Sequence, residues 1–187
     1  MDRTTLKDNV WISVAKQIAT LSKDENTKIG AVIVGADGRV LSTGYNGGAQ
    51  GIADDRIPHG RELRKLQFYM NGELKTVEST KHPFMVHAER NAIECCPRPD
   101  ELKGATIYVT AMPCPDCAWN IARRGISRVV VSEYKDDPNS MVGKDSELSL
   151  FMLAEGNVSV TIGGKAIGLL STLNMENGRI KSRRKHG

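Results

Sequence analysis

A strand–helix–strand pattern in the second half of the chain constrains the fold most strongly. Residues 105–110 and 128–131 are apolar and rich in β-branched residues, and the pattern of residues 115–124 between them is helical. The uninterrupted valines at 129–131 suit a strand that is covered on both faces. Strand, helix and strand within 27 residues are typical of a parallel crossover unit. The chain is therefore predicted to be an α/β protein with parallel strands in its sheet.

The rest of the chain supplies further elements of both kinds. Leu6, Val10, Val14, Ile18 and Leu21 fall on one stripe of an amphipathic helix. Strands are predicted at 29–34, 39–43 and 158–162, helices at 5–21, 87–95 and 146–155, and a glycine-rich loop at 44–48. We expect these elements to pack in layers, as a three-layer α/β/α sandwich with one mixed five-stranded sheet and helices on both faces.

Residues 49–83 are the least regular stretch, with two prolines, several charges and a short helix expected over 61–70. A segment of this length between core elements is typical of a lid or a binding loop. We expect one domain over residues 1–165 with this insertion, followed by a C-terminal extension over 166–187.

The charge of the chain is concentrated at its C-terminal end. The chain has 187 residues and a net charge of +4. Without the five basic residues at the end, 21 basic residues face 22 acidic ones. Those five residues are Arg179, Lys181, Arg183, Arg184 and Lys185. The body is therefore no basic nucleic-acid platform, and we expect no nucleic-acid partner. No apolar run reaches the roughly 18 residues of a membrane span, so we expect no membrane partner.

The four cysteines indicate a reducing compartment. Adjacent Cys95 and Cys96 do not suit a disulfide framework and are expected to be small buried residues. The N-terminus lacks the apolar core of a signal peptide. We therefore expect a cytoplasmic protein in which Cys114 and Cys117 are free to bind a metal ion.

Two short segments point to a zinc site. Cys114 and Cys117 are three residues apart, so both thiolates can face one point in the first turn of a helix. Pro115 suits the first helical position, and the positive end of the helix favours thiolates. His87 opens a neighbouring helix and supplies a third ligand, which leaves the fourth position of a tetrahedral Zn²⁺ for water.

Glu89 follows His87 by two residues and can act beside the ion without binding it. Zinc lowers the pKa of a bound water to about 7, and a glutamate can take up and return its proton. A C-x-x-C pair alone can be a structural zinc half-site or a redox pair, and an H-x-E alone is a weak signal. In this order, and each opening a helix, the two segments form the H-x-E…P-C-x-x-C signature of zinc nucleobase deaminases.

The chain resembles the cytidine deaminase-like superfamily, and within it the deoxycytidylate (dCMP) deaminases. The resemblance covers about residues 10–135 and rests on segments 27–34, 44–47, 87–93, 105–110, 113–117 and 125–131. It implies hydrolysis of dCMP to dUMP and ammonia, which supplies dUMP for thymidylate synthesis. It also implies a homo-oligomer, often a hexamer, with dCTP and dTTP as effectors at a separate site near the Gly44–Gly47 loop.

The resemblance also implies roles for single residues. His87, Cys114 and Cys117 would bind zinc, and Glu89 would carry protons to N3 of the base and to the leaving amine. The backbone N–H of Ala88 would approach the pyrimidine carbonyl. Asn46 would hold the sugar through an amide that both donates and accepts. The alternative for Asn46 is a turn residue that tolerates a positive φ between glycines, and both can hold. The candidates to bind the phosphate lie near positions that face the active site in the family; they are Lys28, Arg98 and Tyr134.

The cysteines of this chain differ from those of some regulated members of the superfamily. It has no cysteine before Cys95, so the second, structural zinc of those members is not expected.

The main alternative function is that of a tRNA adenosine deaminase. In those chains the segment between the asparagine and the zinc histidine is shorter than the 41 positions from Asn46 to His87. A non-catalytic zinc-stabilised interaction module is the alternative of another class, and it would not need Glu89.

Overall fold

The computed structural model of the chain describes residues 2–49, 51–132, 141–168, 175–176 and 179–180. Its centre is a mixed sheet with the strand order β10-β9-β8-β7-β1-β2. In chain order these strands are β1 (Gly30–Val34), β2 (Val40–Tyr45), β7 (Thr106–Val109), β8 (Arg128–Val131), β9 (Ser159–Ile162) and β10 (Lys165–Ile167). β7, β8 and β9 are parallel, and the other neighbours pair antiparallel.

The predicted sandwich is confirmed, but the sheet has six strands and not five. The sixth strand, β10, pairs with β9 after a tight turn at Gly163 and Gly164, both with positive φ. Three residues are too few for a periodic signal, which is why the sequence did not predict this strand. The expected domain boundary after residue 165 falls inside β10.

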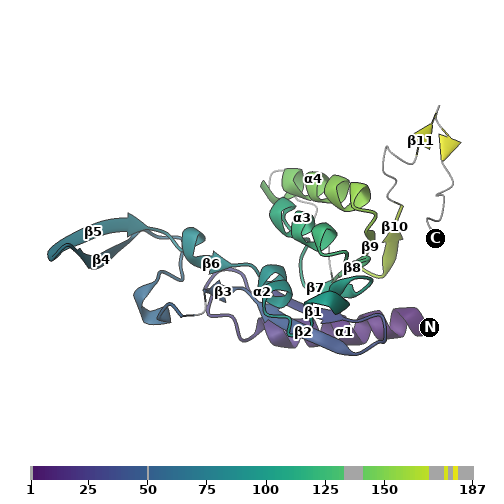
Figure 1. Cartoon of the computed structure of the whole chain (residues 1–187), viewed down its shortest axis with the longest axis horizontal. Helices are drawn as coiled ribbons and strands as arrows, with labels where there is room; N and C mark the ends of the chain where they lie inside the picture. The colour runs from purple at the N-terminus through teal and green to yellow at the C-terminus, as the bar shows by residue number, and fades with distance from the viewer. Residues whose placement is uncertain (1, 50, 133–140, 169–174, 177–178, 181–187) are drawn as a thin grey trace.

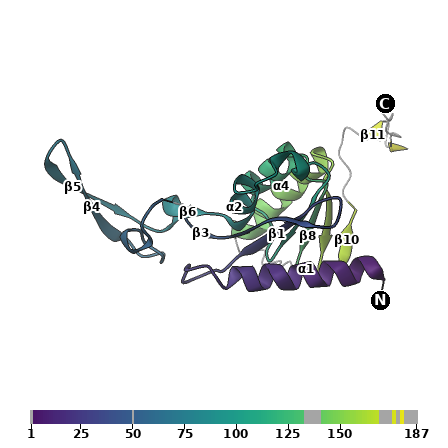
Figure 2. The same ribbon diagram turned by 60° about the horizontal axis from the view of Figure 1, so that its bottom comes forward.

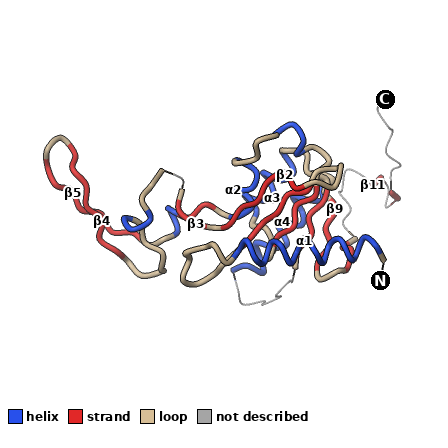
Figure 3. The backbone as a smooth tube through the Cα atoms, turned by 90° about the horizontal axis from the view of Figure 1, so that it is seen from below, coloured by secondary structure: helices blue, strands red, loops and turns tan. Residues whose placement is uncertain are grey.

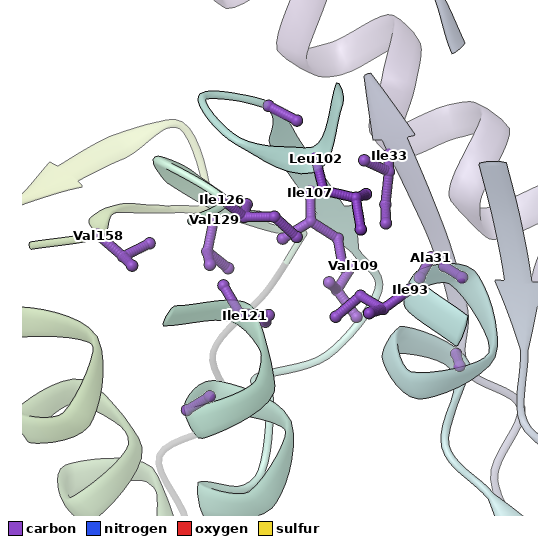
Figure 4. Close-up of a cluster of buried hydrophobic side chains, with 14 of the residues drawn as sticks. Ala31, Ile33, Ile93, Leu102, Ile107, Val109, Ile121, Ile126, Val129 and Val158 are labelled. Carbon is purple, nitrogen blue, oxygen red and sulfur yellow. The ribbon is translucent and has the colours of Figure 1, made fainter. Parts of the chain in front are cut away.

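Helices cover both faces of the sheet (Figure 2). Helix α1 (Arg3–Ala19) packs on one face, and α2 (Ala88–Glu94), α3 (Pro115–Arg123) and α4 (Met141–Glu155) cover the other. On the face with three helices, Ile33, Ile107 and Val129 meet Ile93 and Ile121 in the larger core cluster (Figure 4). Val130 points to the α1 side, so the valine run is buried on both faces as predicted.

Helix α1 buries a face that neighbours the one that its apolar stripe predicted. Leu6, Val10 and Leu21 are exposed, whereas Ala15 and Ala19 are buried against the sheet. The reason is the close approach of α1 to β1, where a Cβ on Gly30 would lie 2.7 Å from the backbone nitrogen of Ala19. Only small side chains fit at this closest point, so Ala15 and Ala19 lie at the centre of the interface. Val14 and Ile18 of the predicted stripe pack at its edge and are partly buried.

A buried polar network fixes α1 on the sheet. The carboxylate of Asp8 accepts hydrogen bonds from Arg128 at 2.9 and 2.6 Å and from the Tyr108 hydroxyl at 3.2 Å. Arg128 also donates to Thr161 at 3.0 Å. This network joins α1 to three neighbouring strands, and a charged residue on the buried face is what the apolar pattern could not reveal.

Residues 64–79 form a long β-hairpin that projects from the body (Figures 1 and 3). Its strands are β4 (Arg64–Met70) and β5 (Glu73–Ser79), so the helix expected over 61–70 is wrong. The connecting residues Asn71 and Gly72 both have positive φ, at 55° and 81°. Asn-Gly between β-rich segments is the strongest short hairpin signal, and it decides the structure here.

The glycine-rich stretch at 44–48 is more regular than the predicted loop. Its first two residues end β2, and its last two form β3 (Gly47–Gly48), which pairs with β6 (Met85–Val86). This pairing brings Asn46 close in space to the segment that leads into His87. The remaining short elements are η1 (Asp54–Arg56), η2 (His82–Phe84), η3 (Pro99–Leu102), β11 (Met175–Glu176) and β12 (Arg179–Ile180).

Within the described residues, no helix combines the length and the apolar character that crossing a membrane requires. Cys96 is buried as expected, whereas Cys95 is exposed at the C-terminal end of α2.

Candidate active site

The N-termini of α2 and α3 meet above the carboxyl end of the central strand β7. His87 is the residue before α2 and Cys114 is the residue before α3, both with extended backbone. Pro115 occupies the first helical position, where its missing N–H leaves no hydrogen bond unmade. Cys117 lies in the first turn of α3 and is buried. Two separate helix starts therefore deliver one imidazole and two thiols to the same point.

The three ligand atoms fit a zinc ion. The sulfurs of Cys114 and Cys117 lie 3.4 and 3.5 Å from Nδ1 of His87. Zn–N and Zn–S bonds in tetrahedral geometry place such atoms about 3.6 Å apart. Among the described residues with metal-binding side chains, this is the group whose ligand atoms all lie within 4.8 Å of one another. The predicted set of His87, Cys114 and Cys117 is thus brought together, with a donor chemistry that zinc prefers.

The electrostatics of the two cysteines favour a cation. The thiol of Cys117 donates a hydrogen bond to Cys114, which together with His87 lowers the pKa of Cys114 to about 4 despite its burial. The same hydrogen bond and burial raise the pKa of Cys117. The hydrogen bond to Cys114 also raises the pKa of His87. The lowered pKa of Cys114 favours its thiolate, which is the form of a cysteine that binds a metal ion.

Glu89 lies beside this cluster in the first turn of α2. Its side chain is buried, with the residue 4% exposed. Burial raises the pKa of Glu89 to about 7, although a hydrogen bond from its own backbone N–H and the charge of His87 oppose the shift. A carboxyl group with this pKa can both accept and release a proton at neutral pH. The geometry therefore supplies a proton carrier next to the metal ligands.

Asn46 is buried and its amide is held in one orientation. Oδ1 accepts a hydrogen bond from the backbone N–H of Ile29 at 2.7 Å, and Nδ2 donates to the carbonyl of Thr27 at 2.8 Å. Nδ2 also donates to Oδ2 of Asp24 at 3.3 Å. Among the described non-glycine residues, positive φ occurs at Asn71 and Asn157, so the expectation of a positive φ at Asn46 is wrong.

The remaining predicted residues lie at different distances from this centre. Ala88 is fully buried at the first position of α2, where backbone N–H groups have no partner within the helix. Lys28 is exposed, next to the Thr27 carbonyl that Asn46 contacts. Arg98 follows the far end of α2, about 10 Å along the helix from His87, and pairs with Glu101 at 3.0 Å. Tyr134 lies outside the described residues.

Two hollows border the site. One of about 630 Å³ lies between α2 and α3 and reaches His87 and Cys117, with Phe84, Arg90 and Trp119 in its wall. The other, of about 430 Å³, is lined by the glycine-rich stretch itself. Its lining includes Gly44, Tyr45, Gly47, Lys23 and Asp54.

Sequence reasoning missed two residues of the site, Asp24 and Lys81. Asp24 accepts hydrogen bonds from the backbone N–H groups of Asn26 and Thr27, which is the local turn that its residue type favours. That turn was available as a signal. The ion pair with Lys81 joins positions 57 residues apart and leaves no local pattern in the sequence.

A histidine and two cysteines at paired helix starts on an α/β/α sandwich, with a buried glutamate beside them, define the zinc-dependent nucleobase deaminases. The comparisons with known proteins name the family. The protein-family model described as the cytidine and deoxycytidylate deaminase zinc-binding region matches residues 6–133, so the chain belongs to this family.

Curated relatives agree with that assignment. The deoxycytidylate deaminase of Mycobacterium phage D29 is 40% identical over 124 residues, which are 66% of this chain and 91% of the phage protein. A deaminase of Aliivibrio fischeri, described as uncharacterized, is 33% identical over 151 residues, 81% of this chain and 89% of its own. Human deoxycytidylate deaminase is 36% identical over 126 residues, and the match spans 67% of this chain and 64% of the human protein.

A solved structure confirms the fold. The apo crystal structure of dCMP deaminase from cyanophage S-TIM5 matches with a TM-score of 0.59 at 22% identity. The match covers 87% of this chain and 99% of that chain. The cytidine deaminase-like architecture predicted from the sequence is therefore confirmed.

Proposed function

We propose that this chain catalyses the zinc-dependent hydrolytic deamination of dCMP to dUMP and ammonia and so supplies dUMP for thymidylate synthesis. The observation that carries the proposal is the trio His87, Cys114 and Cys117 with the buried carboxyl of Glu89 beside it. The substrate follows from relatives named deoxycytidylate deaminase, among them the phage D29 protein at 40% identity. A fold neighbour from cyanophage S-TIM5 has been crystallised with dCMP and dUMP.

In this mechanism His87, Cys114 and Cys117 would hold the zinc ion, which would supply Lewis-acid activation of water near neutral pH. The carboxylate of Glu89 accepts a proton from the water molecule as its oxygen bonds to C4 of cytosine, and then delivers a proton to N3. Glu89 then takes up the remaining proton from the hydroxyl group now on C4 and passes it to the amine at C4. The C4–N bond breaks, ammonia leaves, and the oxygen stays on the ring as the carbonyl of uracil. Burial suits Glu89 for this shuttle because its pKa of about 7 allows both transfers.

Substrate recognition is assigned to Ala88, Asn46 and Lys28. The backbone N–H of Ala88 lies at a helix start and donates to the pyrimidine carbonyl. Asn46 holds the sugar, and Lys28 on the exposed edge beside it contacts the phosphate. Arg98 and Tyr134 remain in the proposal as further phosphate contacts, although Arg98 would have to reach across from the far end of α2.

Regulation and assembly are part of the proposal. The hollow lined by Gly44, Tyr45 and Gly47 supports an effector site for dCTP or dTTP, since it lies beside the glycine-rich stretch and contains Lys23, which pairs with Asp54 of the same lining at 2.6 Å. Exposed apolar residues on α1 and α4, among them Val10 and Phe151, support a homo-oligomer such as a hexamer.

The free cysteines support a cytoplasmic location. Of the extension predicted over 166–187, the part that follows β10 is proposed as a separate C-terminal segment.

The test is an ammonia-release assay with the zinc-loaded full chain. The substrates are dCMP, dCTP, cytidine, deoxyadenosine monophosphate and a tRNA anticodon stem, each with and without dCTP or dTTP as effector. We expect turnover of dCMP that a chelator abolishes and zinc restores. Turnover of a nucleoside or of the tRNA stem, with none of dCMP, would contradict the substrate assignment.

A Glu89→Ala variant separates an enzyme from a zinc-stabilised interaction module. An enzyme keeps its zinc and its fold and loses turnover, because the alanine cannot carry a proton. Zinc content measured by elemental analysis and unfolding followed by circular dichroism give both readouts. A module would show no turnover in the wild type and no change in the variant.

A further inference from the structure

A buried ion pair lies under the proposed sugar site. The ammonium of Lys81 lies 2.5 and 2.6 Å from the two carboxylate oxygens of Asp24. Both residues are only 4% exposed. Taking two charges out of water is costly, and removing one partner leaves an uncompensated buried charge. A pair this deeply buried is therefore a fixed part of the structure and not a surface contact.

The carboxylate of Asp24 organises the turn that carries the site wall. It accepts hydrogen bonds from the backbone N–H groups of Asn26 at 2.8 Å and Thr27 at 2.9 Å. Its other oxygen accepts one from Nδ2 of Asn46 at 3.3 Å. Ser22, two residues earlier, donates its hydroxyl proton to the carbonyl of Asn46 at 2.7 Å. One short segment thus holds both the side chain and the backbone of Asn46.

These contacts decide what Asn46 can offer a ligand. Both hydrogens of Nδ2 are used, by the carbonyl of Thr27 and by Asp24, and Oδ1 already accepts one hydrogen bond from Ile29. An amide oxygen has two lone pairs, so a single acceptor position on Oδ1 remains. The expectation that this amide donates and accepts together is therefore replaced by a narrower one: Asn46 accepts a hydrogen bond from a hydroxyl group.

Lys81 links this arrangement to the projecting hairpin. It follows β5 by two residues and precedes His87 by six, and its backbone N–H donates to the carbonyl of Gly60 at 3.2 Å. The ammonium therefore anchors the end of the hairpin segment to the turn that holds Asn46. The same side chain connects the segment before the metal ligand to the wall of the site.

We propose that Asp24 and Lys81 are positioning residues that hold the Asn46 amide as a hydrogen-bond acceptor for the sugar hydroxyl of the substrate. This inference rests on the proposed function. In dCMP the hydroxyl in question is the 3′-hydroxyl, since the 2′ position has none and the 5′ oxygen carries the phosphate. Asp24 acts by occupying Nδ2, and Lys81 acts by holding Asp24.

The test compares dCMP with 2′,3′-dideoxycytidine monophosphate, which lacks only the 3′-hydroxyl. For the wild type we expect kcat/KM to be about fivefold higher with dCMP, the contribution of one neutral hydrogen bond. The main variant is Asp24→Asn/Lys81→Met, which removes both charges and so avoids leaving one of them buried and unpaired. We expect its preference for dCMP to fall towards unity, through a loss on dCMP alone.

Lys75→Met is the matched control. Lys75 lies on the hairpin in a surface ion pair with Glu73 at 2.7 Å, and it contacts none of the site residues named above. The control should keep the wild-type preference. A merely structural role for Asp24 and Lys81 would lower kcat/KM equally on both substrates in the double variant, and that result would overturn the proposal.

A second measurement does not depend on turnover. In ¹H–¹⁵N spectra, the side-chain NH₂ signal of Asn46, identified by its loss in Asn46→Asp, should be slow to exchange with solvent in the wild type. In Asp24→Asn/Lys81→Met its exchange should become at least about tenfold faster, because one of its two acceptors is lost. Unchanged exchange would contradict the positioning role. Absence of dCMP turnover in the wild type would instead contradict the proposed function and leave this result standing.

Discussion

Replacing Gly44 with alanine should damage catalysis more than stability. Gly44 lies in β2 directly beneath α2, the helix that carries Glu89. A Cβ placed on Gly44 would lie 2.5 Å from the backbone nitrogen of Ala92 and closer still to the carbonyl oxygen of Ala88. Both atoms belong to the backbone of α2, so no side chain can rotate away. The helix itself has to move.

The size of the movement follows from ordinary contact distances. Contacts of a Cβ normally begin at 3.4 Å, so α2 must move away from β2 by about 1 Å. Overpacking of this kind costs roughly 1–3 kcal/mol of folding free energy. A displacement of about 1 Å at a catalytic group can lower the rate by about a hundredfold. Because α2 carries Glu89 and begins next to His87, we expect a loss in kcat of that order.

The assay measures kcat on dCMP, zinc per chain and the midpoint of thermal unfolding. Gly156→Ala is the matched control, since its Cβ would lie 2.5 Å from Cβ of Ala122 at the far end of α3. The control should lose similar stability and keep kcat within a few-fold of the wild type. If Gly44→Ala and Gly156→Ala lose stability and kcat in the same proportion, the positional argument for α2 is refuted.

Two further predictions concern pH. Burial raises the pKa of Asp24, but hydrogen bonds from Lys81, Thr27 and Asn26 outweigh it and leave the pKa below its ordinary value. The stability that this lowered pKa contributes is present above the unfolded pKa of about 3.9 and is lost as the pH falls through the lower native pKa. The free energy of unfolding should therefore fall less steeply with decreasing pH in Asp24→Asn than in the wild type. Equal slopes would contradict this. Burial and the nearby Asp8 carboxylate raise the pKa of Tyr108 to about 12. The stability that the neutral phenol contributes is complete below the unfolded pKa of about 10 and is lost as the pH rises from there to about 12. In Tyr108→Phe the free energy of unfolding should therefore fall less steeply over this pH range than in the wild type. An equal fall in both proteins would contradict the raised pKa of Tyr108.

The central layers were predictable because their signals are local and periodic. The β7–α3–β8 crossover, the buried valines of β8 and the helix starts at His87 and Cys114 all follow from short patterns. A proline at the first helical position and a pair of cysteines three residues apart fix the local geometry wherever they occur. To predict the metal cluster, only one long-range contact had to be known, namely that the two helices begin side by side. The sandwich fold places them so.

The rest depended on contacts between distant residues. Periodicity correctly placed Val14 and Ile18 against the core, but Leu6 and Val10 are exposed because the close approach at Gly30 and the pairing of Asp8 with Arg128 turn a neighbouring face of α1 inward. A pattern of apolar residues carries no information about either contact.

The hairpin and the support of Asn46 were missed for different reasons. The Asn71-Gly72 turn was a readable signal, and a helical interpretation of the charged stretch before it obscured the strand β4. The Asp24–Lys81 pair was not readable, because two charged residues 57 positions apart look like solvated side chains until the fold buries them together.

The most direct test of the account is a Glu89→Gln variant assayed for zinc and turnover together. Glutamine keeps the size of the side chain and cannot carry a proton, so kcat on dCMP should fall by at least about a hundredfold. Zinc per chain and the unfolding midpoint should equal those of the wild type, because His87, Cys114 and Cys117 are unchanged. A variant that keeps its turnover, or one that loses its zinc along with its activity, would contradict the proposed division between three residues that hold the ion and one that moves the proton.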